Sequence, residues 1–437
     1  MNFVQFQVAP GGCLTGQLRV PGDKSISHRA LLFGAIASGQ TTVTGFLESQ
    51  DCLATLAAVR ALGARVVHDN ARWLIDGVGA AGLKEPAKAL DLGNSGTSMR
   101  LLAGLVAGQS FTTRLTGDES LCRRPMSRVI DPLTLMGASV ASKHGRAPLE
   151  IQGRRPLVAI DYTPPVASAQ IKSCILLAGL FAQGTTTVHE PGVSRDHTER
   201  MLAGFGVPVE REGAQVSVIG GATLNAIDVS VPADLSSAAF FLVGAAIADG
   251  SDLWLTDVGT NPTRRGVLDC LTRMGAAITC HNAREVAGEP VADLRVGAST
   301  LTAIEIGAAD VELAIDELPA LCIAAACAQG TTRISGAAEL RVKESDRIAV
   351  MADGLAALGV HAEVYDDGMA ITGGTTGQVF TGGRIASHGD HRIAMAFAMA
   401  GLRASGSIVI DDCAPVATSF PDFEALAAKA GLAITRQ

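Results

Sequence analysis

The sequence predicts an α/β protein of two globular domains, each built from three repeated β/α units packed around internal helices. Three observations lead to this fold class. A strand–loop–helix pattern recurs six times, Ala-rich apolar segments separate the copies, and the 437-residue chain is too long for one core. The composition agrees, because 48% hydrophobic residues with only 4% aromatics and 49 glycines suit helices layered on sheets.

The repeated pattern is the strongest of these observations. A Gly precedes a run rich in Thr or Val, typical of a half-buried strand, and apolar residues at three- and four-residue spacing then indicate an amphipathic helix. A second Gly closes each copy where a helix C-terminus needs a left-handed residue. The copies cover residues 39–63, 108–137, 184–206, 250–275, 330–359 and 406–431, and the second is weakest at its start. Ordinary β–α alternation is the alternative, but it does not account for the shared glycine positions.

Two segments between the copies, 237–248 and 318–328, are apolar along their whole length and predict buried helices. No copy has G-x-G-x-x-G after a strand, and G-x-x-x-x-G-K-[ST] does not occur in the sequence. A dinucleotide-binding fold and the commonest nucleotide-phosphate loop therefore have no support.

Composition also narrows location and partners. The net charge of −8 opposes binding of nucleic acid or an anionic membrane, but not of small anions, which local Arg and Lys can bind. Nine scattered cysteines without a C-x-x-C pair indicate buried thiols in a reducing compartment. The apolar run 238–248 is too short to span a bilayer and no basic region opens the chain, so we expect a soluble cytoplasmic protein. No spacing of His, Cys, Asp or Glu suggests a metal site.

The first motif with chemical content is PGDKSISHRA at 21–30. A helix that begins near Ser25 would place Ser25 and Arg29 on one face. A helix N-terminus with free N–H groups, joined by Lys24 and Arg29, forms a strong anion site. A capped surface helix with ordinary basic residues is the alternative.

Two further motifs supply a glycine-rich turn and a pair of arginines. Residues 93–97 (GNSGT) let the backbone approach a ligand closely and open an apolar helix that carries Arg100. Arg124 precedes Pro125, a favoured first-turn residue, so Arg124 is predicted to project from the start of a helix and to suit a carboxylate or phosphate. A tight connection and solvated surface arginines are the alternatives.

Other polar and charged residues stand at the start of apolar helices. Ser168, Gln170 and Lys172, with Ser194 and Arg195 from the next copy, could hold a second polar ligand or act as ordinary caps. In the second half of the chain, three clusters of charged residues precede or open such helices. They are Asp316 and Glu317; Lys343, Glu344 and Arg347; and Asp390, His391 and Arg392. Burying such charges is costly unless they serve a function, and partial burial is expected to raise the pKa of a carboxylate at the mouth of residues 318–328.

Taken together and in this order, PGDKSISHRA, LGNSGTSMR, GDESLCRRPM, SAQIKS, RVKESDR and GDHR resemble the enolpyruvylshikimate-phosphate synthases along essentially the whole chain. The resemblance implies the enolpyruvyl transferase fold, with a discontinuous domain of residues 1–22 plus 236–437 and an inserted domain of residues 23–235. Each domain would hold three repeats, with the hinge at the crossings near 22 and 236. Domain closure over the substrates is expected to exclude water from the reacting carbon.

The resemblance also implies an activity. Members of this family transfer the enolpyruvyl group of phosphoenolpyruvate to the 5-hydroxyl of shikimate 3-phosphate, a step of chorismate and aromatic amino-acid biosynthesis. The implied reaction is an addition–elimination through a tetrahedral intermediate that releases phosphate and uses no cofactor or metal. We therefore expect these two small molecules as partners, no nucleic acid or membrane, and a monomeric enzyme.

Site residues are implied position by position. Phosphoenolpyruvate is expected to contact Lys24, Gly96, Arg124, Gln170, Arg347 and Arg392. Shikimate 3-phosphate is expected to contact Lys24, Ser25, Arg29, Ser168, Ala169, Gln170, Ser194, Arg195, Asp316 and Lys343. Asp316 is the candidate base for the attacking hydroxyl, and Glu344, with Lys24, the candidate acid for the donor methylene.

The sequence departs from the family pattern at three positions. Thr418 stands where many relatives carry a donor-binding Lys, His197 stands where many carry a substrate-facing Tyr, and Ala169 replaces a common Ser. A related enzyme that uses UDP-N-acetylglucosamine is the nearest alternative, although its K-N dipeptide and mobile-loop Cys are not matched here. A non-catalytic anion-binding protein and an RNA-end-modifying relative are the alternatives from other classes.

Overall fold

The computed structural model describes residues 4–374 and 377–437. The chain forms two compact units. The terminal unit comprises Met1–Pro21, Pro232–Glu285 and Pro290–Gln437, and the inner unit comprises Gly22–Val231 and Val286–Glu289. The predicted domain boundaries at 22 and 236 and the hinge there stay predictions, and residues 1–3 and 375–376 of the predicted discontinuous domain lie outside the described residues.

The inner unit is built on three four-stranded sheets, ordered β16-β3-β5-β4, β6-β7-β9-β8 and β11-β13-β15-β14, with a two-stranded pair β10-β12. Its strands are β3 (Ser38–Thr44), β4 (Arg65–Asp69), β5 (Arg72–Val78), β6 (Leu90–Asp91), β7 (Thr112–Thr116), β8 (Ser139–Lys143), β9 (Arg146–Gln152), β10 (Leu157–Val158), β11 (Asp161–Tyr162), β12 (Ala182–Gln183), β13 (Thr185–His189), β14 (Val209–Glu212), β15 (Gln215–Ile219) and β16 (Asp228–Ser230). Its helices are α1 (Lys24–Ile36), α2 (Gln50–Ala61), α3 (Gly96–Ala107), α4 (Glu119–Arg123), α5 (Ser127–Leu135), α6 (Ala169–Gly179) and α7 (His197–Gly204).

The terminal unit has the same plan, with sheets ordered β18-β19-β17-β2, β20-β21-β23-β22 and β24-β25-β1-β26. Its strands are β1 (Phe6–Val8), β2 (Thr15–Leu18), β17 (Asp252–Gly259), β18 (Ala277–Val286), β19 (Glu289–Gly297), β20 (Glu305–Ile306), β21 (Gly330–Ile334), β22 (Ala362–Tyr365), β23 (Gly368–Gly373), β24 (Gly383–Ala386), β25 (Ile408–Asp411) and β26 (Ile434–Arg436). Its helices are α8 (Leu235–Ile247), α9 (Gly266–Arg273), α10 (Ala308–Ala314), α11 (Leu318–Ala326), α12 (Arg347–Ala357), α13 (His391–Ala400) and α14 (Phe423–Ala430), with 3-10 turns η1 (Ala338–Val342), η2 (Gly401–Arg403) and η3 (Ala414–Thr418).

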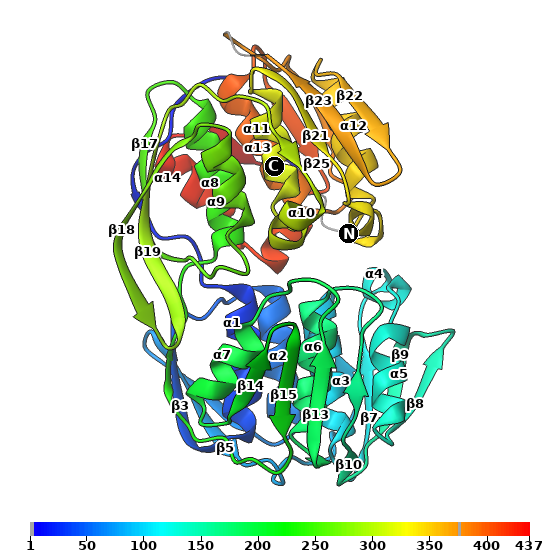
Figure 1. Ribbon diagram of the computed structural model, residues 1–437. Coiled ribbons are helices and arrows are strands. Elements are labelled where there is room, and N and C mark those ends of the chain that lie inside the picture. The colour runs from blue at the N-terminus through cyan, green and yellow to red at the C-terminus, as the bar shows by residue number, and fades with distance from the viewer. Residues whose placement is uncertain (1–3, 375–376) are drawn as a thin grey trace. The chain divides into compact units, whose positions relative to one another are not determined.

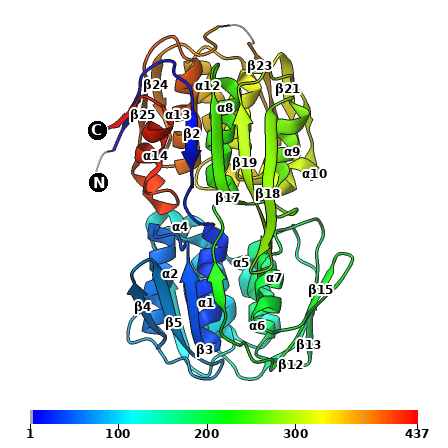
Figure 2. The same cartoon turned by 90° about the vertical axis from the view of Figure 1, so that its left-hand side faces the viewer.

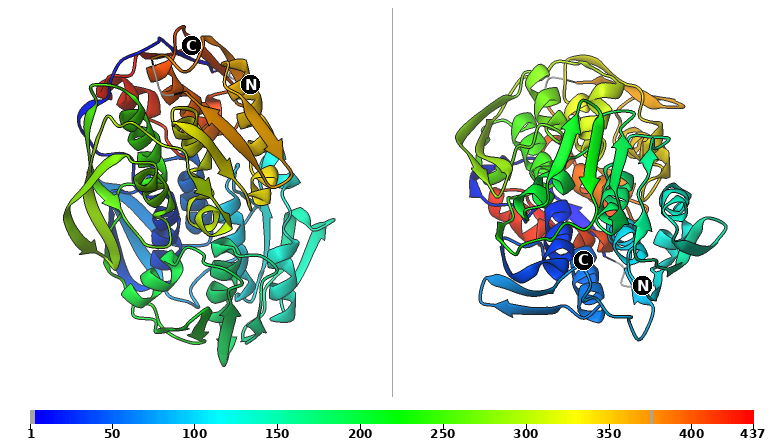
Figure 3. Two further views of the ribbon diagram at one scale, coloured as in Figure 1. Left: turned by 45° about the horizontal axis from the view of Figure 1, so that its top comes forward. Right: turned by 60° about the horizontal axis from the view of Figure 1, so that its bottom comes forward.

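These sheets confirm the predicted fold class of two sets of three β/α units. Each four-stranded sheet begins with a parallel pair at one edge, such as β6 with β7 or β20 with β21, and continues antiparallel. Figure 2 shows one such sheet, β3–β5, beside α1 and α2 in the inner unit, and Figure 3 gives two further views of the sheets. Strands distant in sequence complete three of the sheets: β16 lies beside β3 in the inner unit, and in the terminal unit β2 lies beside β17 and β1 lies between β25 and β26.

The closing glycines behave as predicted. Their backbone torsions φ are positive at all six sites, which are Gly63 (104°), Gly137 (94°), Gly206 (85°), Gly275 (90°), Gly359 (82°) and Gly431 (119°). Side chains disfavour this left-handed region, so glycine ends each outer helix and turns the chain into the next strand.

The core of each unit is formed by three internal helices. These are α1, α3 and α6 in the inner unit and α8, α11 and α13 in the terminal unit (Figure 1). Every residue of α8 and α11 is buried, which confirms the two apolar segments predicted as internal helices. Small residues permit close packing: a Cβ added to Gly104 of α3 would lie 2.2 Å from the Cys174 carbonyl oxygen of α6. Across the described residues, no helix is both long and apolar enough to cross a membrane.

Candidate active site

Most of the predicted site residues lie at the N-terminal ends of the internal helices. Short polar residues cap these ends: Asp23 accepts from the Ile26 N–H, Ser95 from the Ser98 N–H, and Asp390 from the Arg392 N–H. Remaining first-turn N–H groups and the helix dipole make such ends favourable for anions. The local sequence therefore places polar ends on helices that are otherwise apolar.

Arg29 is the central buried cation of the inner unit. Its Nε donates to Thr198 Oγ1 (2.8 Å), Nη1 to the Ser25 carbonyl (2.9 Å) and Nη2 to Ser173 Oγ (2.8 Å), all neutral partners. Burial, together with the like charge of Arg195 and against the opposing charges of Glu199 and Asp23, lowers the pKa of Arg29 to about 10. A buried guanidinium whose hydrogen bonds go to neutral groups suits an anionic ligand.

Lys24 begins α1 one turn before His28 and forms an ion pair with Asp51 at 2.9 Å. Its side chain keeps 20% exposure, whereas that of Asp51 keeps 9%. Lys24 is thus held in a fixed direction by a carboxylate of α2 yet remains partly accessible to a ligand.

Gly96 lies against two guanidinium groups. A Cβ added there would lie 2.7 Å from Arg100 Nη1 and 3.2 Å from Arg124 Nη1. Arg124 Nη2 donates to Asn94 Oδ1 at 2.5 Å, and Arg100 Nη1 donates to Gln170 Oε1 at 2.7 Å. The structure therefore brings together Gly96, Arg124 and Gln170, which were all predicted to contact phosphoenolpyruvate. They meet at the start of α3, where Arg100 adds a further cation.

Arg124 does not project from the start of a helix, as the Arg-Pro pair predicted. It follows the last residue of α4, where its N–H donates to the Leu121 carbonyl at 3.1 Å, and α5 begins only at Ser127. Pro125 thus separates two helices and opens neither, and the guanidinium reaches the turn at Asn94 from the end of α4.

Lys172 was expected among residues that could hold a second ligand. Instead it is buried with its Nζ 2.9 Å from Glu190 Oε1 and 2.6 Å from Glu199 Oε1. Glu190 Oε1 also accepts from Ser194 Oγ at 2.5 Å. Two carboxylates satisfy the Lys172 charge, so its effect is to fix the segment that carries Ser194 and Arg195. Ser168 caps α6 through the Ile171 N–H (3.4 Å), and the Ala169 carbonyl accepts from Ser173 Oγ (2.6 Å).

The terminal unit gathers its predicted residues around Arg347. The buried Arg347 guanidinium donates from Nε to Asp390 Oδ2 (2.8 Å), from Nη2 to Glu344 Oε2 (2.6 Å) and from Nη1 to Asp316 Oδ1 (3.4 Å). Burial would lower the pKa of Arg347, but the carboxylates of Asp390, Glu344 and Asp316 outweigh it and raise the pKa above its usual value. The guanidinium is a permanent positive charge at this site.

Asp390 has a double role in this cluster. It accepts from the Arg392 N–H as the cap of α13 and from Arg347 and Ser345 through its other bonds. Burial acts to raise the pKa of Asp390, but the charge and hydrogen bond of Arg347, together with His391, outweigh burial and hold the pKa below its usual value. The motif GDHR therefore supplies both a helix cap and the counter-ion of a predicted binding residue.

Asp316 is the meeting point of the remaining residues. Its Oδ1 lies 3.4 Å from Lys343 Nζ and 3.4 Å from Arg347 Nη1, and its carbonyl accepts from Arg392 Nη1 at 2.9 Å. Two cations favour the ionised carboxylate, which is the form a general base needs. All five predicted residues of the terminal unit thus form one contact network.

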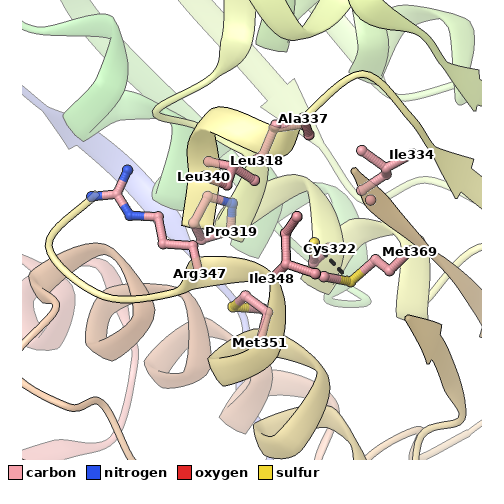
Figure 4. A pocket seen from close by; sticks show the side chains of 11 residues that line it. Leu318, Pro319, Cys322, Ile334, Ala337, Leu340, Arg347, Ile348, Met351 and Met369 are labelled. Carbon is pink, nitrogen blue, oxygen red and sulfur yellow. Dashed lines mark hydrogen bonds between the residues drawn. The ribbon is translucent and has the colours of Figure 1, made fainter. Parts of the chain in front are cut away.

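An apolar pocket borders the Arg347 side chain. Figure 4 shows Leu318, Cys322, Ile348 and Met369 among the residues that line this pocket, and the Arg347 guanidinium points away from them. An apolar flank lowers the local dielectric constant, which strengthens the interaction of the guanidinium with charges on its other side.

The structure shows the hydrogen-bond partners of two residues that depart from the family pattern. Thr418 Oγ1 donates to the Pro415 carbonyl at 2.7 Å, so its hydroxyl closes a 3-10 turn. His197 is buried, and its Nδ1 lies 2.7 Å from Glu289 Oε1. Within the described ranges, 4–374 and 377–437, no group of three or more His, Cys, Asp or Glu side chains could hold a metal ion.

Sequence reasoning missed Asp51, Glu190 and Glu289 as partners of the site residues. Asp51 and Glu289 lie in different elements from Lys24 and His197, and Glu190 lies outside α6, which carries Lys172, so only the fold brings these pairs together. Arg100 was placed on the helix that residues 93–97 open but was assigned to no ligand, although it lies four residues after Gly96 on the same helix face.

Comparison with known proteins matches this fold and arrangement to one class. A family model described as EPSP synthase (3-phosphoshikimate 1-carboxyvinyltransferase) matches residues 8–426. The 3-phosphoshikimate 1-carboxyvinyltransferase of Alkalilimnicola ehrlichii is 61% identical over 435 residues, covering 99% of this chain and 97% of that protein. That of Nitrosococcus oceani is 61% identical over 431 residues, covering 98% and 96%. The solved EPSP synthase of Acinetobacter baumannii superposes with a TM-score of 0.91 at 53% identity, covering 99% of this chain and 100% of that one.

The fold of two three-repeat units and these matches define a carboxyvinyl (enolpyruvyl) transferase. The similarity runs over nearly the full length at high identity and includes a solved structure. The chain belongs to the EPSP synthase family.

Proposed function

We propose that this chain transfers the enolpyruvyl group of phosphoenolpyruvate to the 5-hydroxyl of shikimate 3-phosphate and releases phosphate. The observation that carries the proposal is the Arg347 cluster, where Asp316 and Glu344, the two candidate proton-transfer groups, contact one buried guanidinium. Family membership supports the same reaction, a step of the shikimate pathway.

The donor is an anion with a phosphate and a carboxylate, and the proposed contacts supply matching cations. Lys24 and Arg124 would bind it from the inner unit, and Gly96 leaves room for the ligand. Gln170 would donate a hydrogen bond through Nε2, which here donates to Thr97 Oγ1 at 3.0 Å. Arg347 and Arg392 would bind it from the terminal unit. Guanidinium forks suit planar carboxylate and phosphate groups, and they also stabilise charge that develops on departing phosphate.

The acceptor carries a phosphate, a carboxylate and ring hydroxyls. We assign Ser25, Arg29, Ser168, Ala169, Gln170, Ser194 and Arg195 of the inner unit, and Asp316 and Lys343 of the terminal unit, to its recognition, with Lys24 shared between the substrates. Arg29 and Arg195 supply positive charge, since the hydrogen bonds of Arg29 go to neutral groups.

Proton transfer would use the two carboxylates in opposite senses. Asp316, ionised beside Lys343 and Arg347, takes the proton of the attacking hydroxyl. Glu344, possessing a proton in the reactive state, gives it to the donor methylene with Lys24 assisting. The hydroxyl oxygen bonds to the resulting electrophilic carbon, and the tetrahedral adduct then loses phosphate and a methyl proton to restore the double bond.

The test is phosphate release by the purified chain given both substrates, with and without a chelator. Release that needs both substrates and continues in chelator is the expected result. Asp316→Asn should abolish release, whereas Asp353→Asn, an exposed carboxylate on α12, should behave like the unmodified chain. Release with UDP-N-acetylglucosamine and not with shikimate 3-phosphate would overturn the proposed acceptor.

Monomeric state, cytoplasmic location and compaction on binding both substrates remain predictions. Solution scattering would measure the compaction.

A further inference from the structure

The β18–β19 hairpin ends in a tight turn, and the residues of this turn belong to the inner unit. Ala287 and Gly288 have φ of 50° and 81°, the two positive values of a two-residue type I′ turn. Residues Val286–Glu289 belong to the inner unit, although the strands that carry them belong to the terminal unit. Figure 1 shows the two strands as long arrows. No proposed substrate contact accounts for this arrangement.

The tip is attached to the first turn of α7 by two contacts. Glu289 Oε1 lies 2.7 Å from Nδ1 of His197, the first residue of the helix, and both side chains are almost completely buried. Arg200, one turn further on, donates from Nη1 to the Gly288 carbonyl at 3.0 Å and from Nε to Asp196 Oδ2 at 2.9 Å. A carboxylate near a helix N-terminus also interacts favourably with the helix dipole.

This turn of α7 supports the acceptor-binding residues. Thr198, next to His197, accepts from Arg29 Nε at 2.8 Å and shares a 2.7 Å hydrogen bond with Ser173. Ser194 and Arg195 immediately precede the helix. A displacement of the first turn of α7 would therefore move a partner of Arg29 together with the segment that carries Ser194 and Arg195.

We propose that Glu289 is a positioning residue for binding of the phosphorylated acceptor: it holds His197 and the first turn of α7, which carries the Thr198 partner of Arg29. Glu289 does not touch substrate in this role. The inference rests on the proposed function, because it assigns Arg29, Ser194 and Arg195 to the acceptor.

The test compares Glu289→Gln with Glu285→Gln, an exposed residue of the same hairpin that undergoes the same chemical change. Steady-state kinetics and calorimetric binding of shikimate 3-phosphate alone are measured for both. Glu289→Gln should raise the KM and Kd for the acceptor about tenfold, with kcat and the KM for phosphoenolpyruvate within about twofold of the parent. Glu285→Gln should leave all four quantities unchanged.

A purely structural role gives a different pattern. Unchanged acceptor affinity in Glu289→Gln, or equal losses for both substrates, would overturn the proposal. Arg200→Lys keeps the Glu289–His197 contact but weakens the bond to Gly288, so it should give a smaller loss confined to the acceptor. This variant decides the question if Glu289→Gln does not fold, with unchanged acceptor affinity counting against the proposal. Absence of acceptor binding by the parent chain would instead contradict the proposed function.

Discussion

Arg347 Nε lies 2.8 Å from Asp390 Oδ2, and both side chains are almost fully buried. Asp390 also caps α13, so one carboxylate joins the beginning of α13 to the first residue of α12. This ion pair fixes the guanidinium that Asp316 and Glu344 also contact.

Asp390→Asn is expected to destabilise the fold and to weaken donor binding. Removing one partner of a buried ion pair typically costs about 3–5 kcal/mol when the other charge is left uncompensated. We expect a smaller loss here, because Glu344 and Asp316 still contact Arg347. The pKa of Asp390 is lowered in the folded state, so its stabilisation is present above the unfolded pKa and is lost as pH falls through the folded pKa. The unfolding temperatures of the parent and the variant should therefore differ most near neutral pH, begin to converge below about pH 4 and meet only below the lowered folded pKa. A difference that grows on acidification would contradict the role of the ionised carboxylate.

Arg347→Lys should lower activity although the charge is kept. A lysine cannot reproduce the three directed bonds to Asp390, Glu344 and Asp316, and we expect kcat/KM for phosphoenolpyruvate to fall about a hundredfold. Arg384→Lys is the control, because Arg384 pairs with Asp411 at an exposed position where ion pairs contribute little. Equal effects of the two substitutions in steady-state kinetics would argue against a special role for the buried guanidinium.

Asp316→Asn and Glu344→Gln should reduce the rate far more than binding. Both changes keep the shape of the side chain but remove its ability to take or give a proton, and each is expected to lower kcat by about a hundredfold or more. Substrate affinities measured by calorimetry should change much less. An unchanged kcat with a large loss of affinity would show that these carboxylates bind substrate and do not transfer protons.

Gly96→Ala should impair donor binding selectively. The added methyl would stand 2.7 Å from Arg100 Nη1 and 3.2 Å from Arg124 Nη1, so at least one guanidinium must move. We expect the KM for phosphoenolpyruvate to rise about tenfold while the KM for the acceptor changes little. Gly307→Ala, where an added Cβ meets nothing within 4 Å, is the matched control. A rise confined to the acceptor KM would contradict the assignment of Gly96 to the donor.

Cys280 should be the fastest thiol to react in the native protein. It is exposed, whereas burial raises the pKa of Cys174, Cys322, Cys327 and Cys413 to about 12 and that of Cys270 to about 11. A chromogenic disulfide reagent should show a rapid phase that disappears in Cys280→Ser, and the buried thiols should react only after unfolding. Rapid reaction of these buried thiols in the folded chain would contradict the core packing.

The architecture was predictable because the same glycine positions recur, and the positive φ at Gly63 and at its five counterparts explains the recurrence. The motifs also named the five residues that form the contact network around Arg347 and Asp316. The partners of other residues could not be predicted from the motifs, because Asp51 pairs with Lys24, and Glu289 with His197, only through the fold. Arg124 was placed wrongly because Pro125 can end one helix as readily as it begins another.

The most direct test of the proposed reaction is the identity of its products. Equimolar phosphoenolpyruvate and shikimate 3-phosphate are incubated with the purified chain and followed by proton and phosphorus magnetic resonance. The proposal predicts vinyl protons of an enol ether on the acceptor, appearing one for one with inorganic phosphate and absent with Asp316→Asn. Phosphate release while the acceptor remains unchanged would show hydrolysis of the donor and would contradict enolpyruvyl transfer.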